Sequence, residues 1–186
     1  ALDWISRDLR SAGFAGCVSR GGQLTVYSNP PPAGPAPLAV LRGYENASGF
    51  AYPPGIERLA GDTHSDAVRI VAVDSTARAY VDGDSDVAAA SITIRDNNAG
   101  FEPDDVLVVS DCRRSAVFTV TSVQSRPPRL VHAAARNGGA DTPTHRISPP
   151  FKARDGAFVA RFDSVAYFIG RPKGANHLTI DGAARW

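Results

Sequence analysis

The chain has 186 residues, of which 43% are hydrophobic, and its formal net charge is +1 at pH 7. This length suits one domain with long loops, and the apolar content is sufficient for a core. The near-neutral charge gives no reason to expect a nucleic-acid-binding protein from the chain as a whole. No apolar run approaches the roughly 18 residues that a membrane span requires.

The first 13 residues have the period of an amphipathic helix. Leu2, Ile5 and Leu9 follow one another at spacings of three and four, which places them in one apolar stripe. No capping residue precedes the stripe, so we interpret residues 1–13 as the end of a longer, truncated helix. We expect the stripe to be its packing face. Trp4 lies off the stripe and faces either a neighbouring subunit or a wider buried surface.

Residues 14–66 are predicted to be mostly loop, because turn-forming residues dominate them and five prolines fall between positions 29 and 37. From residue 67 the period changes to two, and residues 67–186 are predicted to be mainly β. No helical pattern separates these strands, which favours an antiparallel sheet. The predicted class is α+β, in one globular domain over residues 1–186: an N-terminal amphipathic helix packed on an antiparallel sheet, with the long irregular loop between them.

One acidic segment has the opening spacing of a calcium loop. Asp82, Asp84 and Asp86 alternate as the first ligands of an EF-hand do. That motif then requires Gly directly after the third ligand and Glu at position 12, and this chain has Val87 and Thr93 there. A solvated hairpin turn is the alternative, and we therefore predict no metal centre.

One of the four histidines lies between two carboxylates. His64 lies between Asp62 and Asp66, and a histidine beside carboxylates can act as a general base. No nucleophile motif such as GxSxG accompanies it. Surface histidines are the simpler interpretation, and this also holds for the scattered residues His132, His145 and His177. The chain is predicted to be no enzyme and to use no cofactor.

The arginines leave a binding function open. Arg113 and Arg114 follow Cys112 directly and either grip a phosphate or form a solvated pair at the end of a strand. A further group keeps nucleic acid as an alternative partner, and its members are Arg126, Arg129, Arg136 and Arg146.

The two cysteines, Cys17 and Cys112, belong to no CxxC motif and no Cys/His cluster, which argues against a zinc site. Two lone cysteines are usually free thiols in a cytosolic protein and a disulfide in an exported one. Composition alone does not choose between these two states.

Several blocks of sequence resemble the PilW-type minor pilins of type IV pili. The most specific are "DLRSAGFAGC" at 8–17 and "DDVLVVSDCRRSAVFTVT" at 104–121, each of which contains one cysteine. "LRGYENA" and "SDAVRIVAVDS" lie between them in the family's order, and "FDSVAYFIGR" at 162–171 is similar to a later strand of the family. The resemblance covers most of residues 1–171.

This resemblance implies a pilin-like fold and a non-catalytic subunit of the pilus tip or of the assembly-priming complex, which supports pilus biogenesis, twitching motility and adhesion. Its partners would be other minor pilins, the major pilin and a tip adhesin. An apolar N-terminal helix, absent from this sequence, would anchor the native form in the inner membrane, with the globular part in the periplasm and later at the pilus tip. The alternatives are a minor pseudopilin of a type II secretion system and a DNA-binding minor pilin for DNA uptake.

The resemblance also implies a disulfide between Cys17 and Cys112, because the globular part of such a protein folds in an oxidising compartment. The bond would join the end of the helix to the end of the strand "DVLVVSD".

Overall fold

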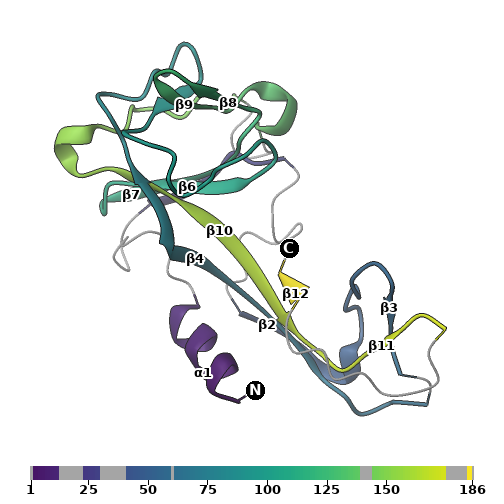
Figure 1. Ribbon diagram of the computed structural model, residues 1–186. Helices are drawn as coiled ribbons and strands as arrows, with labels where there is room; N and C mark the ends of the chain where they lie inside the picture. Colours follow the sequence, from purple (N-terminus) through teal and green to yellow (C-terminus); the bar gives the residue numbers. More distant parts are fainter. Residues whose placement is uncertain are drawn as a thin grey trace. The chain divides into compact units, whose positions relative to one another are not determined.

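The structure is a computed structural model that describes residues 2–12, 23–29, 41–59, 61–138, 144–174 and 184–185. The described part is mostly β, with short helices (Figure 1). The helices are α1 (Leu2–Ser11) and the 3-10 helices η1 (Glu45–Ala47), η2 (Ala134–Arg136) and η3 (Ala153–Asp155). The strands are β1 (Gln23–Val26), β2 (Leu41–Tyr44), β3 (Ile56–Glu57), β4 (Ala67–Tyr80), β5 (Ser91–Thr93), β6 (Val106–Ser110), β7 (Arg114–Thr119), β8 (Ser122–Ser125), β9 (Pro128–Val131), β10 (Phe158–Tyr167), β11 (Arg171–Pro172) and β12 (Ala184–Arg185).

The chain divides into two compact units. The first contains residues 1–13, 38–72 and 164–186, and the second contains residues 14–37 and 73–163. The two longest strands, β4 and β10, each contribute residues to both units. The largest sheet has the strand order β1-β7-β6-β10-β4-β2, with β12 also paired to β10.

The second unit is organised around the β6–β7 hairpin. Its two strands are antiparallel, and Ser110 lies opposite Ser115 close to the turn. Strand β10 pairs with β6 in antiparallel orientation, whereas β1 pairs with β7 in parallel, Gln23 lying opposite Arg114. A separate three-stranded sheet has the order β5-β9-β8. The unit therefore contains a mixed sheet and an antiparallel one.

A continuous apolar core fills this unit. Leu107 on β6 and Phe118 on β7 face each other in register, and neither side chain is exposed. Side chains alternate between the two faces of each strand, so every second residue of the short strands packs into this core. The largest fully buried apolar side chains of the unit include Phe101, Phe118, Phe151, Ile92, Ile94 and Leu130.

A side-chain amide completes the edge of β7. Asn137, which is 3% exposed, accepts a hydrogen bond from the backbone N–H of Thr119 through Oδ1 at 2.9 Å. Its Nδ2 donates to the backbone carbonyls of Thr119 at 2.9 Å and Ala133 at 3.0 Å. Ser28 forms a β-bridge with Asn137, and its Oγ lies 2.6 Å from the Thr119 hydroxyl. The amide thus satisfies both backbone groups of a buried residue, as a neighbouring strand would.

The first unit is built around an aromatic cluster. Phe50 contacts the rings of Tyr44, Tyr52 and Phe168, with centroid separations of 5.0–5.3 Å. The pairs with Tyr44 and Tyr52 are edge-to-face, which is a favoured geometry for aromatic side chains. Beside the cluster β3 pairs with β11, and a Cβ added to Gly170 would lie 2.8 Å from Cγ2 of Ile56. Glycine is therefore required at that close approach.

The predicted fold class, an α+β fold with the helix packed on an antiparallel sheet, is wrong. The chain is mostly β, and the pairing of β1 with β7 makes the main sheet mixed. Helix α1 has ten residues, and its apolar stripe is only partly covered, since Ile5 is half-buried and Leu9 is 41% exposed. The reason for the difference is that a repeat of apolar residues reveals a face but not what covers it.

None of the helices in the described ranges combines the length and the apolar character that crossing a membrane requires.

Candidate functional site

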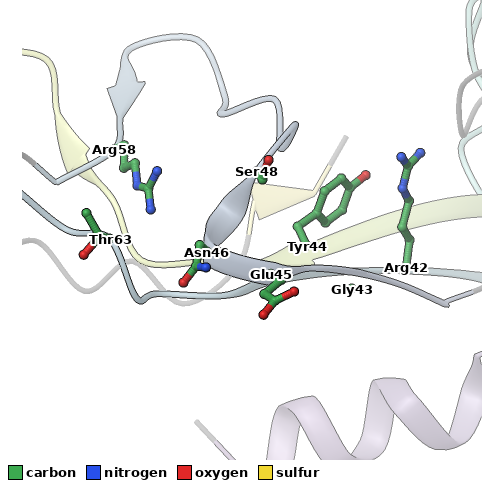
Figure 2. A pocket seen from close by; sticks show the side chains of 8 residues that line it. All are labelled: Arg42, Gly43, Tyr44, Glu45, Asn46, Ser48, Arg58 and Thr63. Carbon is green, nitrogen blue, oxygen red and sulfur yellow. The ribbon is translucent and has the colours of Figure 1, made fainter.

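A hollow among the described residues lies in the first unit. Its volume is about 560 Å³, and it lies beside β2, η1 and the segment that follows β3 (Figure 2). The lining is polar and consists of Arg42, Gly43, Tyr44, Glu45, Asn46, Ser48, Arg58 and Thr63. The lining contains two guanidinium groups and a single carboxylate, so the hollow is suited to an anionic or hydrogen-bonding ligand.

A left-handed turn forms one side of the hollow. Asn46 and Ala47 have φ values of 50° and 49°. Asn tolerates this region, whereas Ala enters it at a cost. The backbone N–H of Asn46 donates to Oδ1 of Asp66 at 2.8 Å, which fixes the turn to the segment before β4. The local backbone is therefore held in a conformation that few sequences adopt.

Strand β2 supplies another part of the lining. Figure 2 shows Arg42 and Tyr44 projecting to one side of β2 and Glu45 projecting to the other. The Arg42 guanidinium carbon lies 5.0 Å from the Tyr44 ring centroid, a distance at which a cation is attracted to a ring face. Tyr44 is 7% exposed and anchors this pair to the aromatic cluster through Phe50.

Arg58 is the most unusual member of the lining. Its Nε and Nη2 atoms are buried, and no described residue accepts a hydrogen bond from them. Hydrogen bonds from Ser65 and His64 lower the pKa of Asp62, and the nearby charge of Arg58 lowers it further. Buried N–H groups without acceptors are costly, so a ligand oxygen in the hollow would relieve that cost.

The segment around His64 is a turn and not a catalytic pair. Oδ1 of Asp62 accepts hydrogen bonds from the backbone N–H groups of His64 and Ser65 at 3.1 and 3.0 Å. His64 is exposed, and Asp66 is bound to the backbone of Asn46 instead. The three residues predicted as a possible acid–base group therefore serve local structure.

The three aspartates of the calcium-loop pattern do not converge. Asp84 lies 3.9 Å from Nζ of Lys152, and Oδ1 of Asp86 accepts the backbone N–H of Ala89 at 2.9 Å. Asp82 is exposed on an adjoining segment. In the part of the chain that the structure describes, no group of three or more His, Cys, Asp or Glu side chains is arranged to hold a metal ion.

His132 is not a surface histidine, contrary to the sequence interpretation. It is 1% exposed and lies 5.4 Å from the Phe118 ring, centroid to centroid. Its Nδ1 donates to the backbone carbonyl of His145 at 2.9 Å. Burial lowers the pKa of His132 from 6.5 to about 4, although the hydrogen bond to His145 opposes this change. His145 is half-buried, and His177 lies outside the described residues.

We expect His132 to make stability depend on pH. Below pH 6.5 the unfolded chain binds a proton that the folded chain does not bind until about pH 4, so stability falls as the pH falls through this window. The loss from this residue is about 1.4 kcal/mol between pH 7.5 and 5.5. Urea unfolding of the wild type and of His132→Gln at both pH values measures it. The variant should lose this component, and the exposed-site control His64→Gln should keep it.

The Arg113–Arg114 pair is divided between two environments. Arg113 is exposed, whereas Arg114 donates to the backbone carbonyls of Pro149 and Pro150 at 2.6 and 2.7 Å. The guanidinium carbon of Arg114 also lies 4.2 Å from the Phe151 ring centroid. Arg114 therefore holds a loop on the protein and is not a phosphate-gripping residue.

The predicted cysteine pair is only half described. Cys112 lies in the β6–β7 turn with φ 64°, and its backbone N–H donates to Ser110 Oγ at 3.2 Å. Cys17 lies outside the described residues, so the pairing of the two stays a prediction.

The predicted packing face of α1 is accessible at one of its described residues. Leu9 is 41% exposed, Ile5 is half-buried, and Trp4, off the stripe, is 62% exposed. The structure does not describe the side chain of Leu2. The helix is bound by a polar contact, in which the Tyr167 hydroxyl donates to Oδ2 of Asp8 at 2.7 Å. Apolar side chains on this helix therefore remain free to meet another molecule.

The sequence did not predict this hollow. Arg42, Tyr44 and Asn46 belong to the block "LRGYENA", which indicated the resemblance but no role for single residues. The lone signal for Arg58 is its position in a long polar segment, and such segments usually carry solvated arginines. No pattern could have paired it with residues about fifteen positions earlier.

Comparison of the chain with protein-family models, with curated proteins and with solved structures finds no match.

Proposed function

We propose that the chain is a non-catalytic interaction subunit, namely a minor pilin of the PilW type that acts in the tip or assembly-priming complex of a type IV pilus. In this role it contacts other minor pilins, the major pilin and a tip adhesin. Its native form is anchored in the inner membrane through a longer N-terminal helix, with the globular part in the periplasm before export to the pilus tip.

One observation carries the proposal beyond the likeness of the sequence blocks. Helix α1 exposes 62% of Trp4 and 41% of Leu9. Large apolar side chains that stay exposed on one helix are typical of a protein–protein contact. The helix is therefore an assembly surface, and its apolar side chains are the anchors that a neighbouring subunit covers.

Co-purification with the minor pilins encoded beside it, all with full-length helices, tests this function. We expect the wild type to be captured and the double variant Trp4→Ala/Leu9→Ala to lose at least tenfold in capture, because alanine removes the apolar anchors and keeps the helix. The matched control is Arg7→Ala/Arg10→Ala, which changes two exposed polar residues of the same helix and should leave capture unchanged.

Two results would contradict the proposal: failure to bind any of these subunits, or equal capture of the apolar double variant and the control. Capture by minor pseudopilins alone would favour the type II secretion alternative.

A further inference from the structure

The second unit presents an exposed group of arginines around a tyrosine. Its members are Arg78 and Tyr80 at the end of β4, Arg95 just after β5, and Arg129 on β9. We call these four residues the Arg–Tyr face. They come from three separate parts of the sequence, so their proximity depends on strand pairing.

Backbone hydrogen bonds place the three segments side by side. The N–H of Arg95 donates to the carbonyl of Tyr80 at 3.0 Å, and Val81 forms a bridge with Ile94. On the other side Thr93 lies opposite Arg129 in the β5–β9 pair. Tyr80 is thus directly beside Arg95, and Arg129 is one strand further along.

The alternation of side chains puts the four residues on the outer side. The alternate residues point inward and are at most 3% exposed: Ala79, Val81, Ile92, Ile94 and Leu130. Arg78 and Arg95 are exposed, Tyr80 is 43% exposed, and Arg129 is half-buried. Successive residues of a strand face opposite sides, so the Arg–Tyr face is the solvent side of this core.

The face is rich in positive charge. The guanidinium carbons of Arg78 and Arg95 each lie 5.6 Å from the Tyr80 ring centroid. None of its three arginines forms an ion pair with a described residue. Nε of Arg129 is buried and lacks a described acceptor. The exposed guanidinium groups of Arg78 and Arg95 therefore offer donors and charge to an external anion.

Two carboxylates border the face. Asp82 is exposed, and its backbone N–H donates to the Thr93 carbonyl at 2.8 Å, which places it across one strand from Arg129. Asp96 follows Arg95, and its Oδ1 accepts the backbone N–H of Asn98 at 3.1 Å. Asp96 is held in a turn but keeps its charge, so both carboxylates weaken the face for an anion.

We propose that the Arg–Tyr face binds single-stranded nucleic acid. Guanidinium groups bind phosphates with paired donors, and both aromatic rings and guanidinium planes accept stacked bases. Positively charged surfaces with exposed aromatic residues are typical of sites for single strands. A duplex hides its base faces, so it would use the charge of this face and not the tyrosine.

The test is fluorescence anisotropy of a labelled oligo-dT strand titrated with the protein at several salt concentrations. Affinity should fall with salt, because each phosphate contact in a single strand contributes about 0.7 to the slope of log K against log salt. Three arginines predict a slope of about −2. A duplex of the same length and heparin serve as the comparison polyanions, and both should bind more weakly than the single strand.

Four variants separate stacking from charge. Tyr80→Ala should weaken binding at least fivefold with little change in slope, because it removes a stacking platform. Arg95→Gln should weaken binding and reduce the slope by about 0.7. Asp82→Asn should strengthen binding, since it removes one of the bordering charges. The control Arg154→Gln changes an exposed arginine in η3 of the same unit and should bind like the wild type.

Equal binding of single strand, duplex and heparin would overturn the proposal, because charge alone would then account for it. So would an absence of binding at low salt, or a loss in Arg154→Gln as large as that in Arg95→Gln. The outcome is independent of the capture of other pilins through α1, so either proposal stands or fails without the other.

Discussion

Replacing Asn137 by alanine should cost about 3–5 kcal/mol of the free energy of unfolding. The change leaves the buried N–H and carbonyl of Thr119 and the carbonyl of Ala133 without their hydrogen-bond partners. Each buried polar group left unpaired costs about 1–3 kcal/mol. Urea unfolding followed by circular dichroism measures the loss, and a fall of this size is a large part of the stability of a domain.

Two further variants make this prediction specific. Asn137→Asp keeps an oxygen for the Thr119 N–H but aims a second oxygen at two carbonyls, so it should destabilise the protein about as much as alanine does. Asn98 is an exposed asparagine of the same unit, and Asn98→Ala should cost less than about 0.5 kcal/mol. If Asn137→Ala costs no more than Asn98→Ala, the amide does not complete the edge of β7.

Reduction of the protein should lower its stability by about 4–5 kcal/mol through loss of the predicted Cys17–Cys112 disulfide. The bond would close a loop of 112 − 17 = 95 positions, and the chain-entropy model gives about this value for a loop of that length. Urea unfolding with and without reductant measures the difference. The mass of the unreduced, alkylated protein reports directly whether the thiols are blocked.

The double variant Cys17→Ser/Cys112→Ser is the matched control, because its stability should equal that of the reduced wild type and should not respond to reductant. Two thiols that alkylate without prior reduction would refute the disulfide. That result would also weaken the periplasmic location, since both inferences rest on the same resemblance.

The sequence was sufficient for the local strands of the sheets. The block "DVLVVSD" predicted a strand that the structure has as β6. This prediction is confirmed because a run of β-branched and apolar residues between turns needs only its own neighbours to form a hairpin. The block "AVFTVTSVQS" predicted a single strand, whereas the structure divides it between the end of β7 and β8, which belong to different sheets. The start of β4 at Ala67 also depends on local sequence, and the change to a period of two at residue 67 predicted it correctly.

The sequence does not reveal which distant segments pair, and the predicted fold class was wrong for this reason. Nothing in "QLTV" indicates that β1 lies parallel to β7, so the sheet was wrongly predicted to be antiparallel. The hollow was not predicted for the same reason, since Arg58 and Asn46 line it together although they are distant in sequence, and Asp66 holds the turn at Asn46. His132 was wrongly predicted to lie on the surface, because a single histidine is not part of a repeating pattern that would indicate burial.

The parallel pairing of β1 has a consequence for the order of folding. Gln23 and Arg114 are 114 − 23 = 91 positions apart, whereas Ser110 and Ser115, the last pair before the β6–β7 turn, are five apart. Closing the long loop costs more chain entropy than closing the turn. Contacts between residues far apart in the sequence also form more slowly than local contacts. We therefore expect the hairpin to form early and β1 to dock late, so that mutations in β1 mainly accelerate unfolding and mutations in the hairpin mainly slow folding.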